Sequence, residues 1–234
     1  MARCLKGLMV GCTILLLAQA PAWPADPPLA ALSEGFEDIT QLPARGWVLV
    51  NQSEPTGDDW FQGNDTFAAQ SGAANSYIAA NVESVAGVGL GTISNWLMTP
   101  ELMLESGTRI RFWTRTRTPF PGDAPFPDRL QLRLSLDGAS VDVGGSAFSV
   151  GSFTQSLIEI NPALSDQYPI TWTLFEYTLE SIPPSTTGRF AFRYFVTESG
   201  FAGDNGDFIG IDTVSVTSPT APQDDLIFSD RFED

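Results

Sequence analysis

The feature that most constrains the fold is a period-two alternation of apolar and polar residues, which recurs in short stretches from Ser33 onward. Gly, Pro, Asn and Asp separate the stretches, and these residues favour turns. Successive side chains of a β-strand point to opposite faces, so the pattern is typical of strands with one buried face. About eleven strands are predicted: Gly35–Glu37, Gly46–Asn51, Asp59–Gln62, Ser76–Ala80, Asn95–Met98, Thr108–Thr116, Asp128–Leu136, Ser140–Val143, Trp172–Leu179, Arg189–Val196 and Asp207–Thr217. We therefore expect an all-β fold, a jelly-roll β-sandwich of antiparallel strands.

Two local patterns refine this expectation. The pair Asp137-Gly138 lies between two alternating stretches and indicates a tight hairpin. Apolar residues at helical spacing between Phe153 and Ile160 predict at most one short helix, placed in a loop.

Residues 1–22 have the organisation of a secretory signal peptide. Arg3 and Lys6 precede a short apolar core, Leu8–Leu17, and small residues offer cleavage after Ala20 or Ala22. The apolar core is shorter than the roughly 20 residues that a membrane-spanning helix needs, so export is expected rather than anchoring.

The rest of the chain divides by composition. Residues 23–33 form a Pro- and Ala-rich leader, residues 34–217 carry the strand pattern, and residues 218–234 combine a linker with an acidic tail. We therefore expect one sandwich domain, in a protein that is exported.

The composition excludes several chemistries. The 234-residue chain has no His, two Cys and a net charge of −16. Loss of residues 1–22 would remove both Cys, the single Lys and Arg3, so the mature chain would have a net charge of −18 and no Cys, His or Lys. Catalytic triads, His-bound zinc, thiol nucleophiles, lysine Schiff bases and disulfides are then excluded. The acidity also argues against nucleic acid and anionic membranes as partners.

One carboxylate lies inside a stretch that is apolar on both faces. Asp212 in Asp207–Val216 would be buried, and a buried carboxylate needs a cation or hydrogen bonds. Glu37 has a similar β context at the other end of the domain, and Asp58 or Asp59 and Asn75 could add oxygens. These ligands, Glu37, Asp59, Asn75 and Asp212, suit a structural calcium ion, which prefers 6–8 oxygens. In the alternative, Asp212 caps backbone amides or pairs with Arg189 or Arg193.

Arginines recur on one parity of the middle strands. In residues 109–117 the odd positions are Arg, Arg, Trp, Arg and Arg, and the next strand continues with Arg129 and Arg133. Such a face could bind a glycan through Trp113, Arg111, Arg115 and Arg133, by ring stacking and forked hydrogen bonds. In the alternative it is a solvated outer face, on which arginines pair across strands with Asp and Glu.

Several short segments together resemble the choice-of-anchor J domain, a relative of MAM and cleaved-adhesin domains. They are FEDI at 36–39, LPARGW at 42–47, DW at 59–60, WLMTP at 96–100, FWTR at 112–115, RFAFRY at 189–194 and IGIDTV at 209–214. The resemblance implies a jelly roll with no established catalytic activity, and some of those relatives bind calcium at positions like Glu37 and Asp212. The ending at 227–233 is similar to the I-F-x-D-G-F-E tails of some secreted proteins of Gram-negative bacteria, with Arg231 in place of Gly. This resemblance implies a protein that is secreted or held at the surface of a Gram-negative bacterium.

These observations favour a secreted or surface-associated, non-catalytic binding or adhesion module. Its expected partner is a glycan or another cell-surface polymer, and its expected cofactor is calcium. Two alternatives stay open: a polysaccharide hydrolase that uses paired carboxylates, and a self-associating extracellular structural protein.

Overall fold

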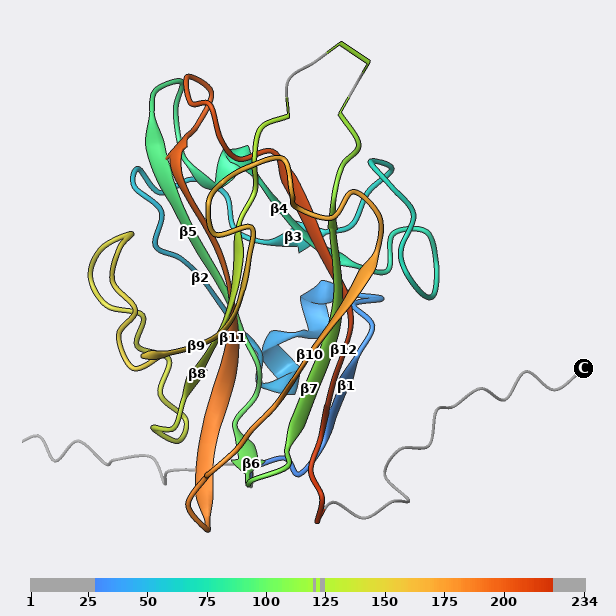
Figure 1. Ribbon diagram of the computed structural model, residues 1–234, viewed down its shortest axis with the longest axis vertical. Coiled ribbons are helices and arrows are strands. Elements are labelled where there is room, and N and C mark those ends of the chain that lie inside the picture. Colours follow the sequence, from blue (N-terminus) through green and yellow to red (C-terminus); the bar gives the residue numbers. More distant parts are fainter. Residues whose placement is uncertain (1–27, 120, 123–124, 221–234) are drawn as a thin grey trace, which may run out of the picture.

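The computed structural model describes residues 28–119, 121–122 and 125–220. The signal peptide and the acidic tail after Thr220 lie outside the described residues, as does most of the leader. The described chain folds into two antiparallel β-sheets that pack face to face as a β-sandwich of 12 strands (Figure 1). The predicted fold class is confirmed.

The first sheet runs in the order β10 (Thr173–Thr178), β7 (Arg109–Thr116), β12 (Phe208–Thr217), β4 (Ile78–Asn81) and β3 (Phe61–Gln62). Strand β1 (Leu32–Glu34) pairs with the far half of β12. Leu32 and Ser33, which the composition assigns to the leader, therefore lie within this sheet.

The second sheet runs in the order β2 (Val48–Asn51), β5 (Gly91–Met98), β11 (Thr186–Ser199), β8 (Leu130–Ser135) and β9 (Gln155–Ile160). Strand β6 (Leu102–Leu104) extends it beside the first residues of β11. The helical elements of the described chain are three short 3-10 turns, Ile39–Gln41, Pro43–Arg45 and Val82–Ser84.

The core lies between the sheets and follows the predicted alternation. Ile110 and Phe112 of β7 face Phe190 and Phe192 of β11, and all four side chains are fully buried. Phe112 and Phe192 meet edge to face, with ring centroids 4.9 Å apart. Burial of aromatic and aliphatic side chains in this layer is the main stabilising contribution to such a sandwich.

Loops also cover part of each outer face. Residues 63–76 bring Phe67 onto the outer side of the first sheet, against Tyr77 and Phe208. Gly210 of β12 leaves room for this contact, because a Cβ there would lie 2.9 Å from the Phe67 ring. Residues 136–154 cross the second sheet in the same way, where Phe153 packs on Trp96.

Several predicted local features are wrong. Residues 155–160 form strand β9 and not a helix. A register shift in the pairing of β8 with β9 lets Leu157 and Ile158 both pack against the core, which mimics helical spacing. Residues 140–143 form no strand, so the turn at Asp137-Gly138 opens the long crossing loop instead of a hairpin. Strand β6 was not predicted, and Gly35–Glu37 follows β1 instead of forming a strand.

Candidate ligand-binding cleft

The four predicted calcium ligands do not form one ligand set in the structure. Glu37, Asp59 and Asn75 are exposed, whereas Asp212 is fully buried. The side-chain amide of Gln62 donates to the carbonyl oxygens of Phe36 and Asn75, at 2.7 Å each, which brings those two segments together. In the described part of the chain, no group of three or more Asp, Glu, His or Cys side chains is placed to hold a metal.

Asp212 is bonded as the amide-capping alternative predicts. Its Oδ2 accepts hydrogen bonds from the backbone N–H of Gln70 at 2.8 Å and Ser71 at 3.1 Å, and its Oδ1 accepts from Thr213 N. Burial raises the pKa of Asp212 to about 6, although these bonds oppose the shift. Asp212 thus fastens loop 63–76 to the sheet without needing a cation, and calcium stays a prediction.

The four predicted glycan-binding residues lie on two different sheets. Arg111, Trp113 and Arg115 project from the outer face of β7, whereas Arg133 projects from β8 on the opposite side of the sandwich. The expectation of a single arginine face is therefore wrong, because β7 and β8 are consecutive in sequence but belong to different sheets.

The contacts of the β7 side chains agree with a solvated outer face. Arg111 pairs with Glu176, its direct neighbour on β10, at 3.5 Å with both side chains about half exposed. Arg115 lies over the Phe67 ring at 4.3 Å from its centroid and donates to the Ile170 carbonyl. These arginines serve cross-strand pairing and loop packing.

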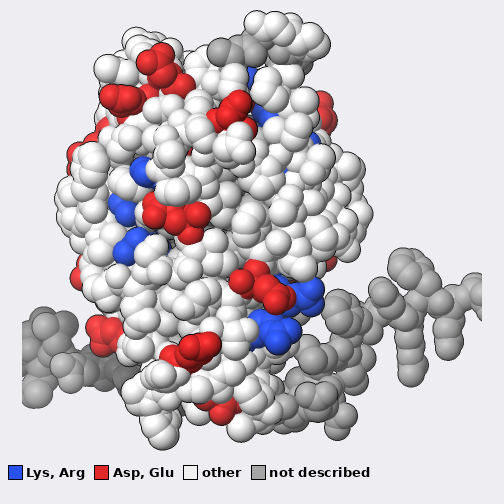
Figure 2. Space-filling model, viewed as in Figure 1, with Lys and Arg blue, Asp and Glu red and all other residues white. Residues whose placement is uncertain are grey.

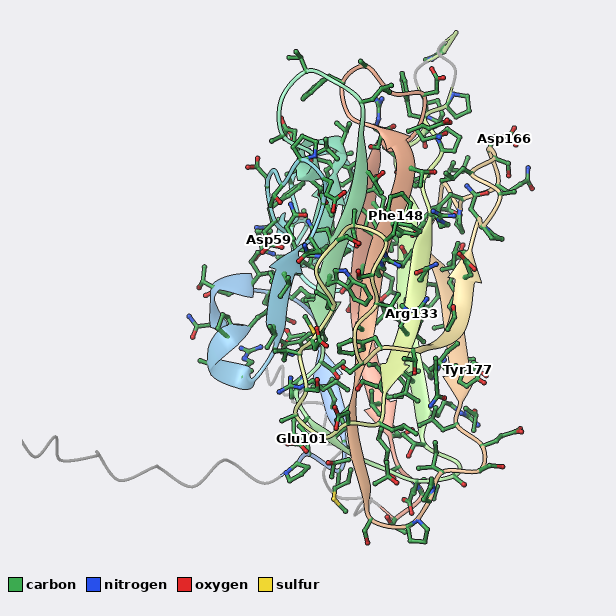
Figure 3. The ribbon with its side chains drawn as sticks, turned by 90° about the vertical axis from the view of Figure 1, so that its left-hand side faces the viewer. Asp59, Glu101, Arg133, Phe148, Asp166 and Tyr177 are labelled. Atoms are coloured by element: carbon green, nitrogen blue, oxygen red, sulfur yellow. The ribbon has the colours of Figure 1, made fainter. Side chains whose placement is uncertain are left out.

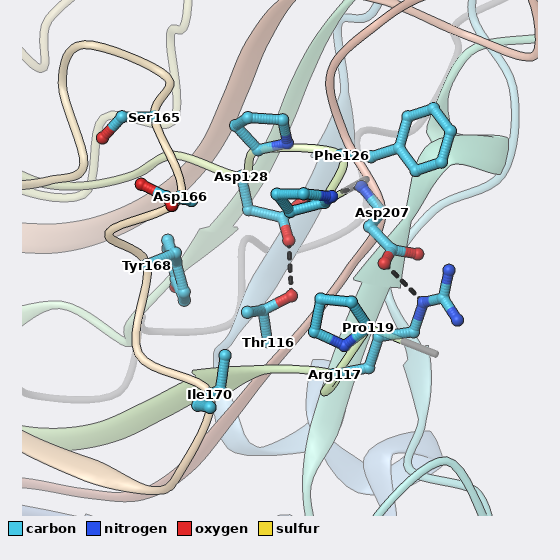
Figure 4. Close-up of a pocket in the computed structure, with 12 residues that line it drawn as sticks. Thr116, Arg117, Pro119, Phe126, Asp128, Ser165, Asp166, Tyr168, Ile170 and Asp207 are labelled. Carbon is cyan, nitrogen blue, oxygen red and sulfur yellow. Dashed lines mark hydrogen bonds and ion pairs between the residues drawn. The ribbon is translucent and has the colours of Figure 1, made fainter. Parts of the chain in front are cut away.

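A cleft of about 260 Å³ opens at the end of the sandwich where β7 ends and β8 and β12 begin (Figure 4). Its apolar walls are Pro119, Pro125, Phe126, Pro127 and Ile170. Its polar lining is Thr116, Arg117, Asp128, Ser165, Asp166, Tyr168 and Asp207. Apolar walls with a few convergent polar groups are typical of small-ligand sites.

The floor of the cleft is built around Asp128, which is 1% exposed. Its carboxylate accepts hydrogen bonds from Thr116 Oγ1 at 2.6 Å, from the backbone N–H of Asp207 at 2.8 Å and from the Tyr194 hydroxyl. Burial raises the pKa of Asp128 to about 6 against the opposing effect of these donors. One carboxylate thus ties together β7, β11 and the start of β12, which makes the floor rigid.

The rim carries an ion pair and an exposed aromatic ring. Arg117 Nε donates to Asp207, and both side chains are largely buried. Phe126 is 44% exposed and also borders a second hollow of about 200 Å³, which it shares with Arg117, Asp207 and Phe201. Asp166 lies on the opposite wall and is exposed.

Sequence reasoning did not identify this cleft. Two features of the sequence belong to the cleft. Asp128 and Asp207 each stand at the first position of a predicted strand, and a proline-rich stretch lies between β7 and β8. Neither feature shows that the two strand ends meet, because β8 and β12 belong to opposite sheets.

The fold is an antiparallel β-sandwich with a cleft at its loop end, and similar proteins are known. Residues 29–125 match the family described as the cleaved adhesin domain. No curated protein matches the chain.

Solved cleaved adhesin domains share the fold over nearly their whole length. The K1 domain of Lys-gingipain from Porphyromonas gingivalis W83 is 24% identical, with 80% of this chain and 98% of that domain covered and a TM-score of 0.55. The K3 domain of the same protein is 23% identical, with the same coverage and a TM-score of 0.50. At this identity the likeness establishes the fold alone. None of the helices in the described ranges is long and apolar enough to cross a membrane.

Proposed function

We propose that this protein is an exported, non-catalytic binding or adhesion module that holds a neutral sugar residue of a glycan in the loop-end cleft. The observation that carries the proposal is the cleft itself, in which an exposed aromatic ring and proline walls face fixed polar groups. A sugar has an apolar C–H face and a polar edge of hydroxyls, so it needs both kinds of surface at once.

The polar groups suit hydroxyls better than charges. Arg117 and Asp207 neutralise each other at the rim. Asp166 and Ser165 add acceptors on the far wall. The match of residues 29–125 to cleaved adhesin domains supports a binding module at the cell exterior, as does the signal-like start of the sequence. We also propose the narrower assignment, that this module is a choice-of-anchor J domain.

The hydrolase alternative is weaker at this site. Glycoside hydrolysis needs two carboxyl groups with oxygens free to meet the substrate. The raised pKa of Asp128 would suit a general acid, but Asp128 is buried and both of its oxygens already accept hydrogen bonds. Asp207 is held by Arg117. We therefore expect binding without turnover.

A glycan array with the exported chain tests the proposal. Phe126→Ala and Asp166→Asn should each weaken binding of the recognised neutral glycan at least tenfold. Met103→Ala is the matched control, because Met103 is 45% exposed on β6, outside the cleft lining. A wild-type chain that binds no neutral glycan would rule the proposal out. Turnover of the bound glycan would favour the hydrolase, and concentration-dependent self-association without any ligand would favour the structural alternative.

A further inference from the structure

Three arginines lie together on the outer face of the second sheet, apart from the cleft. Arg129 directly precedes β8, Arg133 lies within it, and Arg193 lies on β11. Alternate residues of a strand share a face, so Arg129 and Arg133 project on the same side as Gln131. The register places Arg193 beside Gln131, and Phe195 N donates to the Arg129 carbonyl at 3.1 Å. Figure 3 shows Arg133 on this face, with Phe148 above it.

Gln131 connects the group to a single acid. Its Nε2 donates to Glu159 Oε1 on β9 at 2.8 Å. Its Oε1 accepts from Arg133 Nη1 at 3.2 Å and from Arg193 Nη1 at 3.3 Å. A straight row therefore crosses the sheet from Glu159 through Gln131 and Arg193 to Trp96, whose ring centroid lies 4.8 Å from the Arg193 guanidinium carbon.

The other acceptors of the three guanidinium groups are neutral. Arg129 donates to the carbonyls of Phe195 and Pro162, Arg133 to those of Phe153 and Thr154, and Arg193 to Ser94 Oγ and the Ala147 carbonyl. Among the described residues none of these three arginines forms an ion pair. Figure 2 shows blue side chains gathered on the side formed by this sheet, with red ones beside them.

The local charge balance is therefore unusual for a chain of net charge −16. Glu159 is the carboxylate whose charge acts on all three arginines, which leaves an excess of two positive charges. Burial lowers the pKa of each guanidinium, and repulsion from Arg133 and Arg129 adds to burial in lowering the pKa of Arg193 to about 9. An added anion would relieve this repulsion.

The accessible part of the group carries both features of an acidic-sugar site. Arg193 is 2% exposed and lies behind the others, whereas Arg129 is partly exposed, and its Nη2 has no acceptor within the described ranges. The Phe195 ring lies between the guanidinium groups of Arg129 and Arg193, at 4.4 and 3.7 Å. Phe148 packs edge-on against Phe195 with ring centroids 5.9 Å apart and is 63% exposed, so it offers an apolar ring on the same Phe195 side chain that Arg129 contacts.

We propose that this face is a second binding site, which takes the carboxylate of an acidic sugar. Arg129 donates to the carboxylate, Phe148 packs against the sugar ring, and Arg133 and Arg193 stabilise the bound anion through their charge. A purely structural role, in which Arg133 and Arg193 hold loop 136–154 against the sheet, accounts for their bonds to backbone carbonyls. It does not account for the free donor of Arg129 or the exposure of Phe148.

Isothermal titration with trigalacturonate tests this site, and the methyl-esterified trisaccharide is the uncharged control ligand. The wild type should bind the acid form at least tenfold more tightly than the ester, with an affinity that falls as salt rises. Arg129→Gln and Phe148→Ala should each weaken binding of the acid form at least tenfold. Arg111→Gln, which changes an exposed arginine on the opposite sheet, should leave that binding unchanged.

Three results would overturn the proposal: no binding of trigalacturonate by the wild type, equal binding of acid and ester, or equal affinities for Arg129→Gln and Arg111→Gln. Melting curves of each variant show whether the fold is kept, and Arg129→Lys, which retains the charge, should recover part of the binding if Arg129→Gln disturbs the sheet. The cleft is tested with neutral glycans and Phe126→Ala, and this site with trigalacturonate and Arg129→Gln, so failure of one and failure of the other are distinguishable.

Discussion

The Tyr194 hydroxyl donates a hydrogen bond to the Asp128 carboxylate inside the sandwich, and both side chains are buried. Tyr194 lies on β11 and Asp128 lies two residues before β8, so the bond joins β11 to the segment that leads into its neighbour at the base of the cleft. The same carboxylate reaches the opposite sheet through Thr116 and Asp207. The cleft is therefore built on a single buried acceptor that serves both sheets.

Removal of that acceptor should be costly. In Asp128→Ala, the Tyr194 hydroxyl and the backbone N–H of Asp207 lose their acceptor, whereas the Thr116 hydroxyl can still donate to the Phe208 carbonyl. Each unsatisfied buried group costs roughly 1–3 kcal/mol. We expect the free energy of unfolding to fall by about 3 kcal/mol or more, measured by urea denaturation. Tyr194→Phe removes one donor and should cost only about 1–2 kcal/mol. Equal losses in the two variants would contradict the assignment of Asp128 as the shared acceptor.

The stability of the protein should rise as the pH falls from 8 toward 5. Burial raises the pKa values of Asp128 and Asp212 to about 6, above the ordinary value of 3.8. Between these values the folded state binds more protons than the unfolded state, so the free energy of unfolding increases as pH decreases. Asp38 and Glu105 have lowered pKa values and act in the opposite direction, but only below about pH 4. Melting temperatures across this pH range check the sign.

A matched variant isolates one contribution to this slope. Asp212→Asn cannot titrate, so its melting temperature should rise less steeply on acidification than that of the wild type. Glu176→Gln removes an exposed carboxylate that pairs with Arg111 and should leave the slope above pH 5 nearly unchanged. An Asp212→Asn slope identical to the wild-type slope would show that Asp212 does not titrate near pH 6.

Arg193 should control the loop that crosses the second sheet. Arg193→Met keeps the apolar stem but removes the guanidinium that donates to the Ala147 carbonyl of the loop. Ser94 Oγ and Gln131 Oε1 lose one donor each and keep Trp96 Nε1 and Arg133 Nη1. We expect faster amide hydrogen exchange in residues 140–152 and a loss of about 2 kcal/mol in the free energy of unfolding. Arg189→Met is the comparison, since Arg189 donates to the carbonyls of Gly46 and Thr99 instead. Exchange of the loop at the wild-type rate would mean that Phe153 packing alone holds it.

Calcium stays a prediction from sequence, and the structure sharpens its test. The sequence predicts that calcium raises the melting temperature and that Asp212→Ala abolishes the rise. The amide bonds of Asp212 predict instead that Asp212→Ala lowers the melting temperature equally with calcium and with EDTA. A wild-type melting curve that is the same with calcium and EDTA would rule out a structural cation. A calcium-dependent rise that only Asp212→Ala removes would restore Asp212 as a ligand.

The sequence by itself determined the all-β class and which side of most long strands faces the core between the sheets. Period-two alternation reports burial directly, so Ile110 and Phe112, or Phe190 and Phe192, are assigned to the core without any knowledge of their neighbours. It also indicated that Asp212 would be buried, because its stretch is apolar on both faces. A buried carboxylate needs hydrogen bonds or a cation to offset the loss of water.

Only the tertiary structure decided which strands share a sheet. Alternation is a local property, whereas sheet order depends on long-range pairing, so the arginines of β7 and β8 share a parity in sequence but lie on opposite sides of the sandwich. The same pairing brings Asp128 to Asp207 across 79 positions and Arg193 to Gln131 across 62. The cleft and the arginine group both arise from contacts of this kind, which no local pattern encodes.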